Sequence, residues 1–137
     1  MSRPLQLVKF KQGTVKFTAH WALFLANSDT DKDAGLIFHI TSDTNLANVA
    51  SSTQKYMLRK ALYLFDSNNS NVQDRIDIGT CTYIQLDDAT KKVDDGTNYG
   101  NVALNNCQSF ASKVIQELEK SSGGTVHGTG NSCCTVM

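Results

Sequence analysis

One cysteine of this sequence stands where it could act as a nucleophile. Cys107 begins a stretch whose apolar residues recur at helical spacing, so the sequence predicts that it lies in the first turn of a helix. There, unpaired backbone N–H groups and the positive end of the helix dipole stabilise a thiolate over a thiol. The same N–H groups could hold an oxyanion formed when the sulfur attacks an acyl carbon. The alternative is that Cys107 simply begins the apolar stripe as a small hydrophobic residue, and the helix alone does not decide between the two.

A thiol nucleophile needs a base, and imidazole suits this role because its unperturbed pKa is about 6.5. The chain has three histidines. His127 lies in a Gly- and Ser-rich stretch that we expect to be flexible. His20 and His39 stand in apolar runs, where burying two imidazoles is costly unless their nitrogens find partners. Each alone is typical of a packed core histidine, but the pair favours a base that activates Cys107.

The two histidine-bearing runs predict neighbouring strands. Residues 20–25 predict a buried strand whose alternation places His20 on the same face as Ala22. Residues 36–40 predict its partner, and the polar, Asp-rich residues 27–35 predict the loop that joins the two as a hairpin.

Other runs predict the rest of the fold. They predict, in chain order, strands at 5–10, 14–17, 55–65 and 76–84, a short helix at 87–93 and a long helix at 107–119. The run at 55–65 fits a helix or a strand, and the meander that follows favours a strand. Cys81 is expected in the core, and Asn106 is expected to cap the long helix. From residue 121 onward the composition predicts a flexible tail.

Composition and charge narrow the classes of function. The 13 basic and 13 acidic residues of the 137 balance, and no basic cluster indicates nucleic-acid binding. No apolar run approaches the roughly 20 residues that a membrane-spanning helix needs, and the first residues lack a secretory signal, so we expect a cytoplasmic protein. The four cysteines lack zinc-site spacing. The aspartates at 29, 31 and 33 lack the glycine and glutamate positions of an EF-hand, so we expect a solvated loop and neither metal nor cofactor.

Three motifs resemble a known family. The runs HWALFL from His20, FHI around His39 and NNCQSF around Cys107 resemble the lecithin retinol acyltransferase-like families. These are circularly permuted relatives of the NlpC-type papain-like hydrolases, and the likeness is greatest to small fungal members of unknown activity. The resemblance implies that Cys107 is the nucleophile, His20 the general base and His39 the residue that orients it. It marks Asn106 and Gln108 as candidates for the N-cap and the oxyanion site.

The resemblance spans about residues 5–120 and implies an α+β fold of the permuted papain-like kind, in which an antiparallel β-sheet packs against a C-terminal helix carrying the cysteine. Two departures accompany it. The histidines are 39 − 20 = 19 positions apart, wider than in the family's usual hairpin. Gln108 and Ser109 replace the charged residues common after the cysteine in the phospholipid acyltransferases, so the substrate class does not carry over.

The C-terminal sequence predicts lipidation. The last four residues, Cys134-Thr135-Val136-Met137, fit a C-a-a-X box of the type read by a farnesyltransferase. One prenyl chain holds a protein only marginally at a membrane, and S-acylation of Cys133 could supply the second anchor. The alternative is an exposed, redox-sensitive cysteine pair.

These observations predict a domain at 1–120 followed by a flexible tail at 121–137. The favoured function is cysteine-dependent acyl transfer, as a thiol hydrolase or an acyltransferase, on a phospholipid, a lipidated protein or an isopeptide conjugate. We expect the protein to be cytoplasmic, with anchoring to the cytoplasmic face of a membrane through the prenylated C-terminus. Two alternatives stay open: an isopeptidase of the PPPDE type, and a catalytically silent binding module at the membrane.

Overall fold

A computed structural model describes residues 2–11, 20–42, 56–66, 72–93, 106–121 and 123–127. For residues 41, 42, 56, 57, 106 and 107 it describes the backbone alone. The elements in these ranges are β1 (Arg3–Phe10), β2 (His20–Ser28), β3 (Asp31–Ser42), β4 (Tyr56–Leu64), β5 (Val72–Cys81), α1 (Tyr83–Val93) and α2 (Asn106–Ser121). The strand predicted at 14–17 lies outside the described residues.

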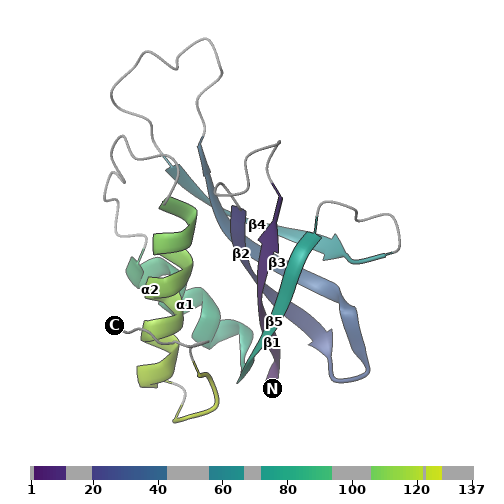
Figure 1. Cartoon of the computed structure of the whole chain (residues 1–137). Coiled ribbons are helices and arrows are strands. Elements are labelled where there is room, and N and C mark those ends of the chain that lie inside the picture. The colour runs from purple at the N-terminus through teal and green to yellow at the C-terminus, as the bar shows by residue number, and fades with distance from the viewer. Residues whose placement is uncertain are drawn as a thin grey trace.

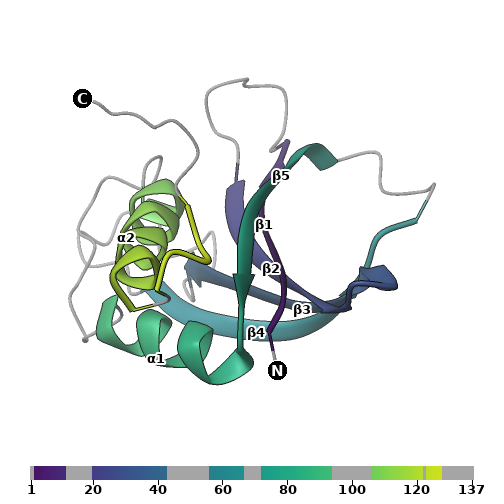
Figure 2. The same ribbon diagram turned by 90° about the horizontal axis from the view of Figure 1, so that it is seen from below.

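The five strands form one antiparallel sheet in the order β4-β3-β2-β1-β5. Both helices lie on one side of this sheet, which curls strongly (Figure 1, Figure 2). The predicted α+β class is therefore confirmed. The prediction of a strand in the stretch 55–65 is also confirmed, because β4 occupies residues 56–64 and pairs with β3 along its whole length.

Apolar side chains form a separate cluster on each face of the sheet. The helix-face cluster lies between the sheet and the helices, and its members include Leu5, Leu23, Leu25, Phe38, Ile40, Leu86, Phe110, Ala111, Val114 and Leu118. The outer-face cluster consists of Val8, Phe10, Ala22, Phe24, Ala26, Ile37 and Phe65, with Tyr63 and Val72 packed against it. Because strand residues alternate between faces, β2 contributes to both clusters. Burial on both faces explains why residues 21–25 form an unbroken apolar run.

The hairpin between β2 and β3 differs from its prediction. Residues 27–35 were expected to form a loop, but β2 continues to Ser28 and β3 begins at Asp31, so only Asp29 and Thr30 form the turn. The Ser28 hydroxyl accepts a hydrogen bond from the Asp31 backbone N–H at 3.1 Å. These strand ends are exposed to solvent, so polar residues can occupy them and still belong to the strands.

Helix α1 begins four residues earlier than predicted. Residues 76–84 were expected to form a strand, but β5 ends at Cys81 and Tyr83 is already helical. The cause is a capping box at Thr82 and Gln85. The Gln85 N–H donates to the Thr82 hydroxyl at 3.0 Å, and the Thr82 N–H donates to the Gln85 side-chain oxygen at 2.9 Å. Cys81 is fully buried, as predicted.

Helix α2 agrees with the prediction to within two residues at each end, and it packs against β2, β3 and α1. Its buried positions recur at helical spacing, and its outward positions are mainly polar or charged. The face that it presents to the sheet is the apolar stripe identified in the sequence.

Residues 123–127, which we call the C-terminal strap, are fixed against β5 and were wrongly expected to belong to a flexible tail. The Thr80 N–H donates to the Thr125 carbonyl at 2.9 Å, and the His127 N–H donates to the Ile78 carbonyl at 2.8 Å. Between them Val126 forms a bridge with Gly79, and its side chain is 1% exposed. The strap adds an apolar side chain to the helix-face cluster, which offsets the entropy lost on ordering it.

Candidate functional site

The two predicted histidines meet in the structure. His20 begins β2 and His39 lies in β3, and the Nε2 atom of His20 is 2.7 Å from the Nδ1 atom of His39. Their ring centroids are 4.9 Å apart, with the rings nearly perpendicular. At this distance one nitrogen donates its proton and the other accepts it, so the two imidazoles form a hydrogen-bonded pair. The pairing of the two strands brings together residues 19 positions apart.

Both imidazoles are held in the neutral form. Burial lowers the pKa of His20 to about 4, and the charge that His39 would carry lowers it further in the same direction. Burial also lowers the pKa of His39, helped by the positive charge of Arg59. Arg59 lies directly opposite His39 in the β3–β4 register. A neutral imidazole can accept a proton, and a neighbouring anion would be needed to stabilise the resulting imidazolium.

The histidine pair lies on the outer face of the sheet. The ring of Phe10, a member of the outer-face cluster, is 6.3 Å from that of His20. Phe10 in turn contacts Tyr63 edge to face at 5.8 Å. The alternation of side chains along β2 leads to the same conclusion, because it places His20 on the same face as Ala22, a member of the outer-face cluster.

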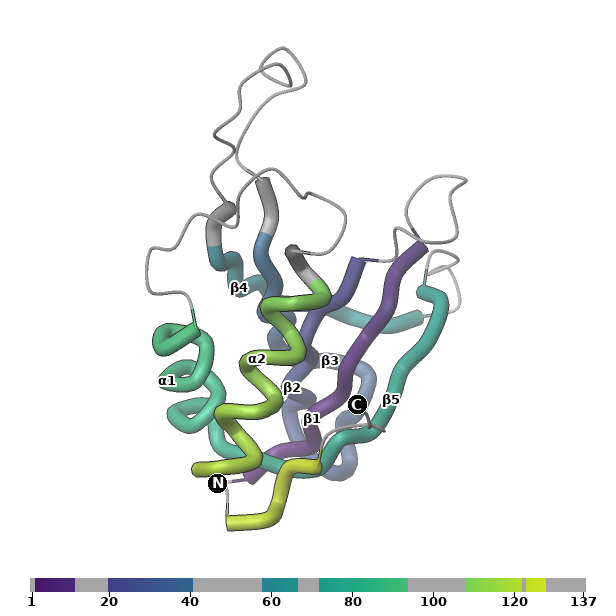
Figure 3. The backbone as a smooth tube through the Cα atoms, turned by 60° about the vertical axis from the view of Figure 1, so that its left-hand side comes forward, coloured from purple at the N-terminus to yellow at the C-terminus, as the bar shows by residue number. Residues whose placement is uncertain are grey.

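Cys107 belongs to the first turn of α2, as predicted, and this helix packs on the other face of the sheet. The helix begins at the end of the sheet where β2 begins and β3 ends (Figure 1, Figure 3). The side chains of Cys107 and Asn106 lie outside the described part of the chain. Gln108 is described and is half-buried. The structure thus brings His20 and His39 together and places the backbone of Cys107 at the same end of the sheet, on the opposite face.

Two aspartates of the hairpin, Asp31 and Asp33, contact side chains of the chain itself. Asp31 accepts a hydrogen bond from the Asn27 side chain at 3.0 Å, and Asp33 forms an ion pair with Arg75 at 3.0 Å. Within the described ranges, no three His, Cys, Asp or Glu side chains gather as metal ligands. Cys133 and Cys134, the predicted lipidation sites, lie outside the described residues.

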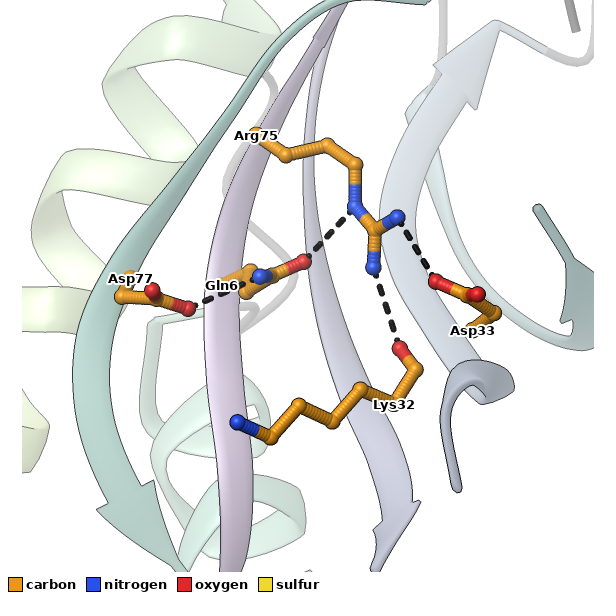
Figure 4. Close-up of polar contacts among 5 residues, drawn as sticks. All are labelled: Gln6, Lys32, Asp33, Arg75 and Asp77. Atoms are coloured by element: carbon orange, nitrogen blue, oxygen red, sulfur yellow. Dashed lines mark hydrogen bonds and ion pairs between the residues drawn. The ribbon is translucent and has the colours of Figure 1, made fainter. Parts of the chain in front are cut away.

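Sequence reasoning missed Arg75, whose polar contacts reach across the sheet from β5 to β1 and β3 (Figure 4). Its guanidinium lies 3.9 Å from the centre of the Phe65 ring, a cation–π distance. It donates to Gln6 at 2.9 Å, to Asp33 at 3.0 Å and to the Lys32 carbonyl at 3.0 Å. Arg75 thereby ties β5 to β1 and β3 across the curl of the sheet. No local pattern indicates this, because its partners are distant in sequence.

No family model, no curated protein and no solved structure matches the chain.

Proposed function

We propose that the protein is a cysteine-dependent acyl-transfer enzyme, a thiol hydrolase or an acyltransferase, with a permuted papain-like fold. The observation that carries this proposal is the 2.7 Å contact between His20 and His39. Two half-buried imidazoles cost more than apolar residues of similar size, so a pair joined by a hydrogen bond favours a chemical role. The order of the elements, histidine strands before the cysteine helix, also supports it.

In the proposed reaction, His20 accepts the Cys107 thiol proton as the sulfur attacks an acyl carbonyl carbon. Backbone N–H groups in the first turn of α2 hold the resulting oxyanion. The carbon–leaving-group bond then breaks, and His20 returns the proton to the leaving group. Water or an amine attacks the thioester, which releases the acyl group and regenerates the thiol. His39 acts as a positioning residue through its hydrogen bond to His20.

This mechanism makes a geometric demand. His20 lies on the outer face, whereas α2 covers the other face, so Cys107 and His20 must meet around the end of the sheet at which β2 begins. The thiolate would then be the anion that stabilises a protonated His20 despite its lowered pKa.

Thiol labelling tests the proposal. A chloroacetamide probe, followed by peptide mass spectrometry, should label Cys107 faster than the other three cysteines. His20→Ala should slow this labelling about 100-fold, in line with the usual contribution of a general base. His127→Ala is the matched control, because His127 is exposed on the strap and distant from the pair in the sheet. Equal labelling of all four cysteines would sink the mechanism.

The acyl donor is proposed to be a phospholipid, a lipidated protein or an isopeptide conjugate. Incubation of the pure protein with phospholipid vesicles and with ubiquitin-like conjugates, beside Cys107→Ala, separates these substrates. Release or transfer of an acyl group that the Cys107→Ala variant lacks identifies the donor.

The placement of the histidine pair on the outer face favours a second candidate, a catalytically silent binding module. In that case His20 and His39 serve packing, and Cys107 only begins the apolar stripe of α2. This candidate predicts that His20→Ala leaves the labelling rate of Cys107 unchanged, which is the opposite of the result expected for the enzyme.

Membrane attachment is part of both proposals. No helix in the described part of the chain is long and apolar enough to cross a membrane. We propose instead that a prenyl group on Cys134 supplies attachment, with S-acylation of Cys133 as the second anchor. Intact-mass measurement after expression with a farnesyltransferase should show the added lipid, and Cys134→Ser should remove it.

A further inference from the structure

Among the strand residues whose side chains the structure describes, the most exposed large apolar ones lie on β4. Leu62 is 83% exposed and Leu64 is 59% exposed, and the two share one face of the strand because they are two residues apart. Leu36 lies directly opposite Leu62 in β3 and is itself only partly buried. Together they form an apolar surface on the helix side of the sheet, beyond the reach of the helices.

The same strand is an edge of the sheet. In the order β4-β3-β2-β1-β5, β4 pairs with β3 on one side, and no described strand pairs with it on the other. The opposite edge differs, because the C-terminal strap pairs with β5 there. An edge strand with exposed leucines and no proline in its nine residues is a template for pairing with another strand.

We propose that β4 is the interface through which two copies of this chain associate, edge to edge and antiparallel, with the two-fold axis at Tyr63. This association does not require the proposed thiol chemistry.

The sequence of β4 is complementary to itself in this register. With Tyr63 on the axis, each residue from 60 to 66 faces the residue of the second copy for which the two residue numbers add up to 126. Leu62 of each copy therefore faces Leu64 of the other copy, and Lys60 of each copy faces Asp66 of the other. Residues that face each other across antiparallel strands have their side chains on the same face, so the four leucines form one cluster.

Charge favours this register over its neighbours. An axis at Lys60 would place two lysines in contact, and an axis at Leu62 would place Lys60 against Leu64. With the axis at Tyr63, the two copies of Lys60 are six residues apart along the strands, about 20 Å, which is well beyond the screening length of about 8 Å.

Sedimentation equilibrium of the full chain tests the association. The apparent mass should rise with concentration from 15.0 kDa towards twice that value. The double variant Leu62→Lys with Leu64→Lys should remain a monomer. Ile84→Lys is the matched control: Ile84 is 69% exposed but lies on α1, so this variant should associate like the native chain. A native chain that stays monomeric, or a control that loses association to the same degree, would overturn the proposal.

Disulfide trapping tests the register and also guards against misfolding of the lysine variants. In a background with Cys107, Cys133 and Cys134 replaced by serine, the buried Cys81 is the only native thiol left. Leu62→Cys mixed with Leu64→Cys should cross-link several-fold faster than either variant alone, because facing Cβ atoms are about 5 Å apart and diagonal ones farther. Equal rates in all three samples, or no cross-link, would contradict the proposed interface.

Discussion

At the scale of single residues, the histidine pair is the feature that departs most from an ordinary core. His20 and His39 share a hydrogen bond within apolar surroundings, and both are kept neutral by burial. A protonated imidazole at this place would lose hydration and meet the second ring and Arg59. Protonation of the pair therefore destabilises the folded chain. This links the stability of the fold to pH.

The pH dependence follows from the lowered pKa values. The pKa of His20 is about 4 in the folded chain and 6.5 when unperturbed, so the unfolded chain takes up the proton first as the pH falls. The free energy of unfolding should hold its full value above pH 6.5 and decrease as the pH drops from 6.5 towards 4, and the lowered pKa of His39 acts in the same direction. Urea unfolding between pH 7 and 4.5 measures this slope.

Two variants test whether the pH dependence of the free energy of unfolding comes from the His20–His39 pair. His20→Gln keeps a hydrogen-bonding side chain but cannot titrate, so it should flatten the decline above about pH 4.5, where few ordinary carboxylates take up protons. His127→Gln, on the exposed strap, should leave the decline unchanged. An unchanged slope in His20→Gln would contradict the argument.

Sequence reasoning reached part of this site. The predicted juxtaposition of His20 and His39 is confirmed, because apolar runs of strand length identified both strands. The roles of Arg59 and Arg75 were not predicted. The position of Arg59 opposite His39 depends on the register of β4. The contact of Arg75 with Asp33, 42 residues away, depends on the curl of the sheet. Neither the strand register nor the curl of the sheet can be predicted from local sequence patterns.

At the scale of elements, helix α1 shows how a cap fixes a boundary. The sequence predicts a helix start at residue 87 because the apolar residues at 83 and 84 continue the preceding strand-like run. The reciprocal hydrogen bonds of Thr82 and Gln85 place the start at Tyr83. The T-x-x-Q pattern was the signal that could have located it.

Removing this cap should destabilise the protein measurably. Thr82→Ala loses the side-chain acceptor for the Gln85 N–H and should lower the free energy of unfolding by about 1 kcal/mol. Thr82→Ser keeps the hydroxyl and should change it by only a few tenths of that amount. Urea unfolding followed by circular dichroism measures both. A Thr82→Ser variant as unstable as Thr82→Ala would show that the methyl group, and not the cap, matters.

The hairpin was mispredicted for a related reason. Its strand ends carry aspartates because they are exposed, and the sequence of exposed strand ends resembles that of a loop. Gly35 gives a further reason: a Cβ atom there would lie 2.1 Å from the Leu25 carbonyl oxygen, so the close approach of β2 and β3 requires glycine. In the sequence the same glycine looks like a turn residue.

At the scale of the whole molecule, the strap closes one edge of the sheet, and Gly79 makes this possible. Gly79 has a φ of 127°, which side chains rarely adopt, and a Cβ atom there would lie 2.0 Å from the Thr125 carbonyl oxygen. The strap and β5 therefore approach each other only because residue 79 has no side chain.

Gly79→Ala should detach the strap. Backbone strain of about 1–3 kcal/mol and the exposure of Val126, worth about 2 kcal/mol, should together lower the free energy of unfolding by about 3 kcal/mol or more. Gly123→Ala is the matched control, since its φ of 66° is also left-handed but nothing lies within 4 Å of the added Cβ. It should cost about 1 kcal/mol.

Amide hydrogen exchange shows where the change occurs. The N–H groups of Thr80 and His127, which form the bonds between strap and β5, should lose protection in Gly79→Ala and keep it in Gly123→Ala. Retained protection in Gly79→Ala would contradict the role assigned to the glycine.

The overall class of the fold was predictable, but the relation between its faces was not. The apolar runs predicted strands and an amphipathic C-terminal helix, the family resemblance implied the α+β class, and alternation predicted the residues that share a face. Alternation does not say which face of β2 a helix will cover, because both faces carry apolar residues. The position of His20 relative to Cys107 depends on that choice, so the sequence could not supply it.

The strap also limits how the molecule could sit at a membrane. It ends at His127, and Cys134 follows 134 − 127 = 7 positions later. Seven residues reach at most about 25 Å even when fully extended. A prenyl group on Cys134, as proposed, would therefore act as a short tether that keeps the β5 edge close to the bilayer. The β4 edge, at the other side of the sheet, would be left facing a second copy, so that a tethered pair would carry its two lipid anchors at its outer ends.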